Sequence, residues 1–320
     1  MLEIGYALSS EEHGPRAMVE HARAAEGAGF TFCLASDHFH PWVDRQGHSP
    51  FVWSVLGGVA QVTKSMRVGT GVTCPLIRMH PVLVAQAAAT LGEMFEDRFF
   101  LGVGTGENLN EHVTGQRWPR PETRVEMLEE ALEVIRLLWR GETTSHQGRW
   151  YTVDRARIYT MPARQPPIMV AAKGVKSVKV AGRLGDGLIS TTPDAGVVER
   201  FELVGGADKP RYGMLHVCWG SDEDSARRQA FEWWPNGVLE GELSQELALP
   251  AHFEQATSLL DPGDVDTSSI PCGPDPGKHL AAIRTWADAG FDHVYVHQIG
   301  PDQEGFLDFY EREIMPKACS

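Results

Sequence analysis

Side chains that could transfer protons or stack against a flat ligand gather in segment 36–42, which reads SDHFHPW. Histidine changes its charge near neutral pH and therefore often acts as a general acid or base. An isolated histidine is more often structural, but the neighbouring Asp37 and Trp42 favour a catalytic role for His38. His40 either shares in that chemistry or supports the turn that follows.

A further carboxylate, Glu107, lies in segment 102–110, GVGTGENLN. This segment is superficially like a dinucleotide-binding fingerprint, but the third glycine is missing and no acid follows at the required distance. A carboxyl group that is desolvated at the mouth of a site is suited to proton transfer. Glu107 is therefore either a proton-handling group or an acid that caps its loop.

Two short segments could together bind a phosphate group. The first consists of Ala171, Ala172, Lys173 and Gly174. It opens a predicted helix, whose N-terminal N–H groups attract anions, and its lysine adds a positive charge. The second consists of Ser190, Thr191 and Thr192, whose hydroxyls could complete the site. The glycines of segment 69–75, GTGVTCP, allow either the close approach of a flat ligand or an ordinary bend.

The spacing of His38 and His40 also fits a metal-dependent barrel hydrolase, which needs further imidazole and carboxylate ligands on later strands. Two later strands end in AAKG and STT, and His297 has no adjacent aspartate. We therefore expect no metal ion. For His297 we expect a structural role with both ring nitrogens satisfied.

The candidate residues follow short apolar runs that alternate with amphipathic segments, a pattern typical of successive βα units. The predicted strands are 2–7, 30–35, 66–71, 98–103, 168–172, 187–190, 211–218 and 292–297. The predicted helices are 15–28, 51–63, 81–94, 124–140, 175–184, 222–234, 276–289 and 303–314. Eight such units favour a (β/α)8 TIM barrel over an open doubly wound sheet, and the residues after its strands would form the active site.

We expect residues 1–320 to form one such domain. It would carry insertions at about 141–165, where a small hairpin is predicted, and at about 235–275, which is irregular. No internal repeat or linker supports a division into two domains.

The composition excludes several classes of function. The chain has 320 residues, with 29 Lys and Arg against 43 Asp and Glu, which gives a net charge of −14. Nucleic-acid binding is unfavourable on such a surface. No apolar run approaches the roughly 20 residues of a membrane span, and no signal-peptide pattern is present. Five scattered cysteines without a CxxC pair fit a reducing compartment, so we expect a cytoplasmic protein.

The segments SDHFHPW, GTGVTCP, LGVGTGENLN, IYTMP and AAKG with AGRLGDG follow one another along the chain. In this order they resemble the luciferase-like flavin and deazaflavin oxidoreductases. The chain is most similar to the coenzyme F420-dependent glucose-6-phosphate dehydrogenase subfamily, over roughly residues 1–192 and more loosely beyond. The resemblance implies a luciferase-like barrel with insertions, usually a homodimer, and hydride transfer at C5 of a deazaflavin or N5 of a flavin.

The resemblance also implies roles for individual residues. His38 would take the proton of the substrate hydroxyl, Trp42 would stabilise the reacting group, and Glu11 and Glu107 would be active-site carboxylates. The residues that would hold the cofactor are Asp37, Gly71, Val72, Cys74, Asn110, Ala171, Ala172, Lys173 and Gly174. A cis peptide bond is implied between Gly71 and Val72.

Two departures from the subfamily concern the substrate and the cofactor. Members that oxidise sugar phosphates place lysines in two loops, where this chain has TPDAG at 192–196 and VDTSS at 265–269. A phosphate would meet Asp194 and Asp266 there, so we expect a substrate other than glucose 6-phosphate. Lys173 replaces a glycine and would suit the terminal phosphate of FMN, which keeps FMN as the alternative to F420.

The leading expectation is therefore an oxidoreductase that transfers a hydride between coenzyme F420 and a small alcohol, aldehyde or related substrate. An FMN-dependent luciferase-like monooxygenase or reductase is the alternative, and a flavin-binding barrel without catalysis is a third class. Because F420 is polyanionic, basic residues must gather near it. The candidates are Arg45, Lys64, Arg67, Arg78 and Lys173.

Overall fold

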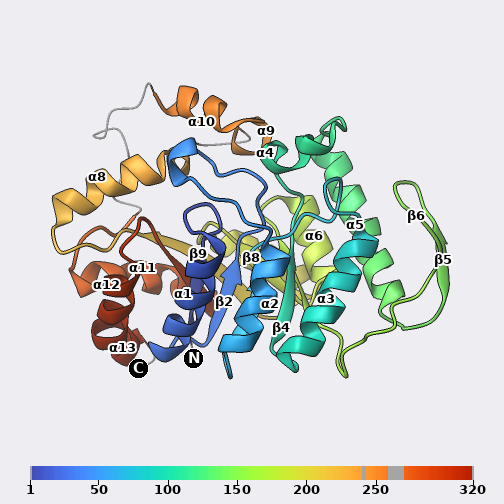
Figure 1. Cartoon of the computed structure of the whole chain (residues 1–320), viewed down its shortest axis with the longest axis horizontal. Coiled ribbons are helices and arrows are strands. Elements are labelled where there is room, and N and C mark those ends of the chain that lie inside the picture. Colours follow the sequence, from blue (N-terminus) through green and yellow to red (C-terminus); the bar gives the residue numbers. More distant parts are fainter. Residues whose placement is uncertain (1, 240–242, 259–269, 319–320) are drawn as a thin grey trace.

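Eight parallel strands form one closed barrel in the computed structural model, which describes residues 2–239, 243–258 and 270–318 (Figure 1). The predicted TIM-barrel fold is thereby confirmed. The barrel strands are β1 (Glu3–Leu8), β2 (Phe32–Ala35), β3 (Arg67–Thr70), β4 (Phe99–Val103), β7 (Ile168–Ala171), β8 (Gly187–Ser190), β9 (Arg211–Val217) and β10 (His293–Gln298). Around the barrel they follow the order β1-β10-β9-β8-β7-β4-β3-β2.

The barrel closes because β1 pairs with both β2 and β10. Gly5 lies opposite Phe32 in this pairing, and a side chain at Gly5 would overlap the Phe32 ring. Large apolar side chains fill the interior, as is usual for this fold. The interior cluster consists of Ala7, Phe32, Leu34, Phe100, Met169, Ile189, Tyr212 and Tyr295.

Helices cover the outside of the barrel, and the main apolar core lies between them and the strands. The longer helices are α1 (Pro15–Gly27), α2 (Val52–Val62), α3 (Pro81–Phe95), α5 (Pro121–Leu138), α6 (Val175–Leu184), α7 (Ala195–Phe201), α8 (Glu223–Trp233), α10 (Pro250–Thr257), α11 (Pro276–Asp288) and α12 (Gln303–Phe309). Proline occupies the first turn of α1, α3, α5 and α11, where its missing N–H group has no helical partner to lose. Across the described residues, no helix is long and apolar enough to cross a membrane.

Short elements complete the chain. The α-helical ones are α4 (Asn108–Glu111), α9 (Leu243–Glu246) and α13 (Met315–Ala318). The 3-10 turns are η1 (Asp44–Gln46), η2 (His112–Thr114) and η4 (Pro235–Val238), and the π turns are η3 (Glu202–Gly206) and η6 (Tyr310–Ile314).

The two predicted insertions take different forms. Strands β5 (Thr144–Gln147) and β6 (Thr152–Ala156) pair antiparallel and form the predicted hairpin, which projects from the barrel in Figure 1. The second insertion contributes η4, α9 and α10 at the end of the barrel where α4 lies (Figure 1). A hydrogen bond of 2.9 Å from Asn108 Nδ2 to the carbonyl of Glu246 ties α9 to α4. The organisation of residues 1–320 as one domain stays a prediction.

Most element boundaries agree with the sequence prediction, and three differences have local causes. Helix α5 begins three residues early because Pro121 starts it. Helix α7 is not among the predicted helices, and Asp194 caps it by accepting a hydrogen bond of 2.8 Å from the N–H group of Gly196. The last predicted helix is divided into α12, η6 and α13.

Glu26, near the end of α1, holds this helix against the chain that enters β3. Its carboxylate accepts hydrogen bonds of 2.6 to 3.0 Å from the N–H groups of Lys64, Ser65 and Met66. Burial alone would raise the pKa of Glu26, but these hydrogen bonds lower it to about 2. A folded-state pKa below the unfolded value means that ionised Glu26 stabilises the fold.

We expect Glu26→Gln to lower the free energy of unfolding at pH 7 by about 1–3 kcal/mol, because three N–H groups lose a charged acceptor. The stabilisation should be complete above the unfolded glutamate pKa of about 4.3 and should decline as the pH falls toward 2. Urea unfolding at several pH values measures the difference between variant and wild type. Glu93→Gln, an exposed position on α3, is the matched control, and an equal loss in both variants would contradict the role of Glu26.

Candidate active site

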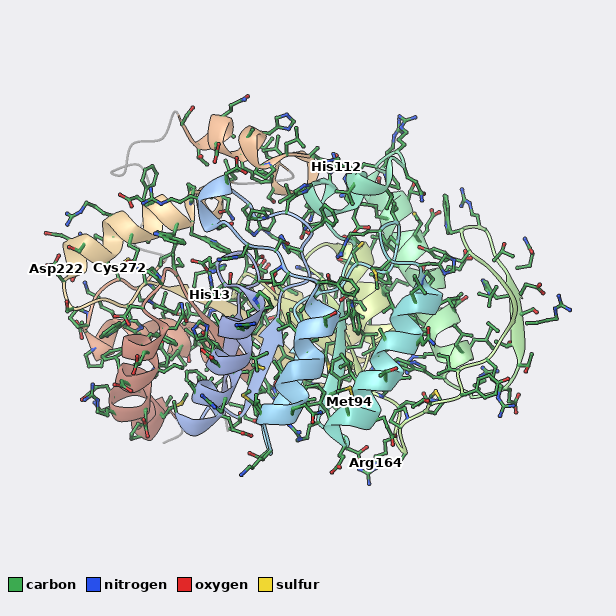
Figure 2. The ribbon with its side chains drawn as sticks, in the orientation of Figure 1. His13, Met94, His112, Arg164, Asp222 and Cys272 are labelled. Carbon is green, nitrogen blue, oxygen red and sulfur yellow. The ribbon has the colours of Figure 1, made fainter. Side chains whose placement is uncertain are left out.

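The candidate residues gather at the end of the barrel where the strands finish. Figure 2 shows His112 at this end of the molecule and Met94 and Arg164 at the opposite end. The loops after β1, β2, β3 and β4 and the short helices α4 and α10 line this end. We call it the barrel mouth below.

A buried acid and a buried histidine form a pair at the barrel mouth. His38 Nε2 lies 3.3 Å from Glu11 Oε1, and their side chains are 9% and 3% exposed. Glu11 Oε2 accepts hydrogen bonds from the hydroxyls of Ser9 at 3.0 Å and Ser36 at 2.6 Å. Burial would raise the pKa of Glu11, but His38 and the Ser36 hydroxyl hold it below its ordinary value. Glu11 is therefore ionised at neutral pH.

The other nitrogen of His38 is occupied by the backbone. Nδ1 lies 3.1 Å from the carbonyl oxygen of His40, to which it donates, so Nε2 is the nitrogen available for proton transfer. The ring of Trp42 meets the His38 ring edge-on at 4.9 Å, and it contacts Phe253 of α10 at 5.3 Å on another side. The predicted trio of Glu11, His38 and Trp42 is thus brought together.

His40 points away from this trio. Its Nδ1 lies 2.9 Å from the carbonyl of Leu109, and its ring stacks on His112 at 5.6 Å. Of the two roles left open by the sequence, support of the loop agrees with this placement.

Asn110 joins the loop after β2 to the loop after β4. Its Oδ1 accepts hydrogen bonds from the N–H groups of Phe39 at 2.9 Å and His40 at 3.2 Å. Its Nδ2 donates to Glu107 Oε2 at 3.3 Å. Glu107 is half-buried and directly precedes α4, so Asn110 fixes the predicted carboxylate relative to the loop of His38.

The peptide bond between Gly71 and Val72 is cis, as the resemblance implied. Val72 packs against the apolar cluster that fills the barrel. Cys74 is buried and touches Gly106, whose φ of +73° and contact with the sulfur both require glycine. Burial, together with Glu111 and Glu107, raises the pKa of the Cys74 thiol well above its ordinary value, so it is a packing group and not a nucleophile.

Behind this loop lies a buried ion network that the sequence analysis missed. Arg78 NH2 lies 2.8 Å from Asp37 Oδ1, and its Nε lies 3.5 Å from Glu111 Oε1. Both acids are 0% exposed, and Asp37 also accepts a hydrogen bond of 2.7 Å from Thr73 Oγ1. Burial raises the pKa of Glu111, and repulsion by the nearby Asp37 carboxylate raises it further. A single arginine thus faces two buried acids. The cofactor contact expected for Asp37 stays a prediction.

The predicted phosphate segments lie next to one another across the pairing of β7 with β8. Gly174 precedes α6 without any side-chain cap, and Lys173 and Thr191 are exposed. The hydroxyl oxygen of Thr192 is buried and has no hydrogen-bond partner among the described residues. Free helix N–H groups, an exposed ammonium group and an unpaired hydroxyl fit a phosphate group.

The five basic residues proposed for a cationic groove do not converge. Arg78 is paired with Asp37 in the buried network, and Arg45 pairs with Glu232 at 2.8 Å. Lys64 and Arg67 lie where the chain enters β3, at the end opposite the barrel mouth. Lys173 is the member of this set that stands beside α6 at the mouth. Whether the five candidates line one groove was open from the sequence, because ion pairing and strand direction cannot be read from the basic residues alone, and their separation favours FMN.

A second acid–histidine system at the mouth was also missed by sequence reasoning. Glu12 Oε2 lies 2.6 Å from His297 Nε2, and His297 Nδ1 lies 2.9 Å from His216 Nδ1. The expectation that both nitrogens of His297 are satisfied is confirmed. The sequence contained part of this signal, since His297 ends one predicted strand and His216 lies two residues before the end of another. Their pairing across β9 and β10 depends on the register.

Within the described residues no group of three or more His, Cys, Asp or Glu side chains is arranged to hold a metal ion. The expected absence of a metal stays a prediction.

Comparisons with known proteins agree with this fold and site. A family model described as luciferase-like monooxygenase matches residues 2–293. An F420-dependent glucose-6-phosphate dehydrogenase of Nakamurella multipartita is 35% identical, with 99% of this chain and 96% of that protein covered. An F420-dependent hydroxymycolic acid dehydrogenase of Mycobacterium tuberculosis is 36% identical, with 98% and 88% covered.

Among solved structures, an F420-dependent secondary alcohol dehydrogenase in complex with an F420-acetone adduct superimposes with a TM-score of 0.91. It is 28% identical, and the match covers 99% of each chain. The family model spans almost all of the barrel, and two relatives above 30% identity extend over nearly the whole chain. The chain therefore belongs to the luciferase-like monooxygenase family.

Proposed function

We propose that this chain is a coenzyme F420-dependent dehydrogenase that oxidises a small secondary alcohol or reduces the corresponding ketone. The observation that carries the proposal is the ionised Glu11 held 3.3 Å from Nε2 of the buried His38. A histidine placed in this way can take a hydroxyl proton, because a carboxylate beside it stabilises the imidazolium that forms. The names of the relatives supply the cofactor and the reaction class.

Bound F420 supplies a hydride acceptor at C5 of its deazaflavin ring. The chain's part of the reaction is to move the proton. As the hydride leaves the carbinol carbon, His38 Nε2 receives the hydroxyl proton, while Nδ1 stays bound to the His40 carbonyl. Glu11, fixed by Ser9 and Ser36, then accepts a hydrogen bond from the new Nε2–H group.

Two further side chains complete the proposed catalytic set. Trp42 forms a wall of the site beside His38 and excludes water from it, with Phe253 behind its ring. Glu107 is the carboxylate held by Asn110 at a fixed place relative to the His38 loop. We assign it to proton exchange on the cofactor side of the site.

The residues proposed to hold the cofactor form two groups. Near the ring we place Asp37, Gly71, Val72, Cys74 and Asn110. Near the phosphate we place Ala171, Ala172, Lys173, Gly174 and Thr191, together with Thr192, whose hydroxyl lacks a partner among the described residues. The scattered basic residues give F420 no cationic groove, so the preference for F420 over FMN rests on the relatives' names.

The proposed substrate is uncharged. Asp194 lies in the loop after β8, where its carboxylate caps α7 and lies 3.8 Å from Arg200. A sugar phosphate that entered this loop would therefore meet a negatively charged side chain that is held in place. Residues 265–269, the other loop in question, lie outside the described residues. Because several relatives are named for glucose 6-phosphate, this sugar phosphate is the competing candidate substrate. The similarity to a secondary alcohol dehydrogenase supports a small alcohol.

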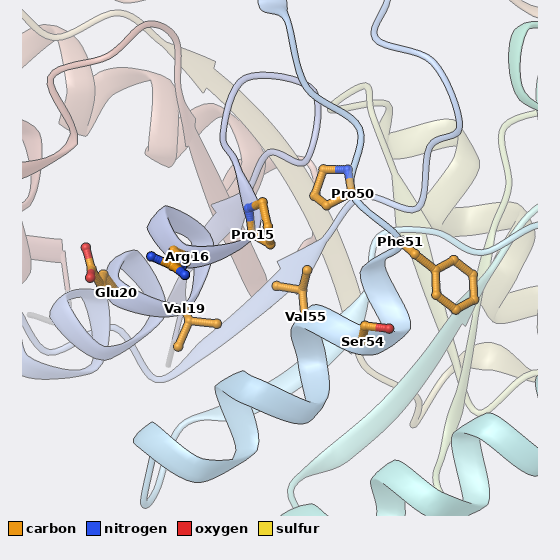
Figure 3. A pocket seen from close by; sticks show the side chains of 8 residues that line it. All are labelled: Pro15, Arg16, Val19, Glu20, Pro50, Phe51, Ser54 and Val55. Atoms are coloured by element: carbon orange, nitrogen blue, oxygen red, sulfur yellow. The ribbon is translucent and has the colours of Figure 1, made fainter.

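We further propose a homodimer, formed through the outer faces of α2 and α3. Helix α2 contains no charged residue, and Glu93 is the only charged residue of α3. Phe51 and Leu83 are each 53% exposed, and Met94 is 37% exposed. Figure 3 shows Phe51 and Ser54 at the beginning of α2, beside a groove between α1 and α2. An uncharged face is unusual on a chain of net charge −14 and is typical of a covered interface.

The proposed compartment is the cytoplasm. The four described cysteines are all unpaired, as the scattered spacing predicted, and this fits a reducing environment.

Titration with each cofactor tests the proposal at its base. We expect F420 to bind at least tenfold more tightly than FMN. The fluorescence of the deazaflavin and of the flavin measures the binding of each cofactor. Lys173→Ala should weaken F420 binding by about two- to fivefold, because an exposed cation beside a phosphate contributes up to about 1 kcal/mol. Lys179→Ala, exposed further along α6, is the matched control. Tighter binding of FMN would select the alternative, and binding of neither would remove the proposed function.

Replacement of the base tests the mechanism. His38→Ala should reduce kcat with propan-2-ol by about 10²–10⁴-fold, because the proton loses its acceptor, while F420 still binds. His146→Ala, on the β5–β6 hairpin, is the control and should keep wild-type turnover. Full activity of the His38 variant would refute the assignment. If the wild-type enzyme has a higher kcat/KM with glucose 6-phosphate than with propan-2-ol, the substrate is the sugar phosphate and not a small alcohol.

Sedimentation analysis tests the dimer. Leu83→Arg should convert the dimer to a monomer, because the new charge would be buried at the interface without a partner. Leu203→Arg introduces the same charge at a leucine that is 85% exposed outside the α2–α3 face and should leave the dimer intact. A wild-type protein that sediments as a monomer would end this part of the proposal.

A further inference from the structure

Three side chains form a hydrogen-bonded line at the barrel mouth, from Glu12 through His297 to His216. Glu12 Oε2 lies 2.6 Å from His297 Nε2, and its Oε1 accepts a hydrogen bond of 2.9 Å from the N–H group of Gly300. The side chains of Glu12 and His297 are 0% and 1% exposed. His297 Nδ1 lies 2.9 Å from Nδ1 of His216, which is half-buried. The proposed proton transfer at His38 uses none of these groups.

The line fixes which nitrogens carry protons. A carboxylate has no proton to give, so His297 Nε2–H donates to Glu12. In a neutral His297 ring the Nδ1 atom is then a bare acceptor, and His216 donates to it through Nδ1–H. The remaining His216 nitrogen, Nε2, is consequently left with a free lone pair. Desolvation lowers the pKa of His216 to about 3, which agrees with a neutral ring at physiological pH.

His216 faces the same space as His38. It follows Tyr212 and Met214 on the inward side of β9, next to the apolar residues that fill the barrel. The ring of Trp234 contacts His216 at 5.2 Å and His297 at 4.4 Å. Trp234 belongs to an apolar cluster against which Trp42, the neighbour of His38, also packs. Nε2 of His216 has no hydrogen-bond partner among the described residues.

We propose that His216 Nε2 is a fixed hydrogen-bond acceptor that selects substrates carrying a second hydroxyl group next to the reacting carbinol. Glu12 and His297 are positioning residues, since they act by holding the His216 tautomer. The inference rests on the proposed dehydrogenase function and narrows its substrate class to vicinal diols and similar hydroxylated alcohols. An ether or phosphate oxygen presents only lone pairs to this nitrogen and is disfavoured.

A matched pair of substrates tests the selection. Propane-1,2-diol and 1-methoxypropan-2-ol share the reacting carbinol, but only the diol offers a second hydroxyl proton. We expect wild-type kcat/KM for the diol to exceed that for the methoxy compound by about tenfold, the effect of one neutral hydrogen bond. His216→Phe should bring the ratio close to one. A wild-type ratio near one, or a ratio unchanged in His216→Phe, would overturn the proposal.

Reversal of the tautomer gives an independent test. In Glu12→Gln the amide oxygen still accepts from Gly300, so the amide NH2 group faces His297 Nε2. Each histidine must then shift its proton, and His216 Nε2 becomes a donor. The ratio of kcat/KM for the diol to that for the methoxy compound should fall toward one, because a hydroxyl and an ether oxygen can both accept from an N–H group. Glu20→Gln, exposed on α1, is the matched control and should keep the wild-type ratio.

Nitrogen NMR of histidine-labelled protein reads the tautomer without any substrate. In wild type we expect His216 Nε2 to have the chemical shift of a bare ring nitrogen, and a protonated Nε2 would overturn the proposal even if Glu12→Gln fails to fold. The outcomes separate the two proposals. No oxidation of either propan-2-ol or propane-1,2-diol with F420 removes the dehydrogenase, whereas turnover without selection between the paired substrates removes only the role of His216.

Discussion

Two consecutive carboxylates, Glu11 and Glu12, are buried directly after β1, and the barrel mouth is organised around the need to compensate them. A buried charge without a partner costs several kcal/mol, so each acid requires its own donors. Glu11 is compensated from the β2 side by Ser36 and His38. Glu12 is compensated from the β10 side by His297 and Gly300. Because β1 lies between β2 and β10, one dipeptide fixes the loops of three adjacent strands.

The same arrangement explains how an acidic chain can accept an anionic cofactor. Glu11, Glu12, Asp37 and Glu111 are buried and hydrogen-bonded, so their charge is neutralised locally and is not presented to an approaching phosphate. The exposed groups beside α6 are instead Lys173 and uncapped N–H groups of the helix. In the proposed function, attraction of the cofactor depends on this short segment and not on the net charge of −14.

The sequence predicted the barrel strands and the main helices closely, because apolar periodicity and proline positions are local signals. It also placed His38, Trp42 and Glu107 correctly at strand ends, since direction along the chain determines the end of the barrel on which a residue lies. It could not reveal Arg78 between Asp37 and Glu111, or Glu12 beside His297. These pairs join residues that are 33 to 285 positions apart, and only barrel closure and strand register bring them together. For the same reason the sequence could not show whether the five candidate basic residues line one groove.

The hydrogen bonds of Asn110 have a consequence for how such an enzyme can diversify. They couple the loop of the base to the loop of Glu107, so a change in either loop disturbs both. Another wall of the mouth is held differently, because Val43 and Leu109 meet Phe253 of α10 through apolar packing. Apolar contacts tolerate exchange of one side chain for another of similar volume far better than hydrogen-bonded networks tolerate loss of a partner. New substrate ranges are therefore accessible by mutation of that wall, while the proton-transfer machinery is inherited as a unit.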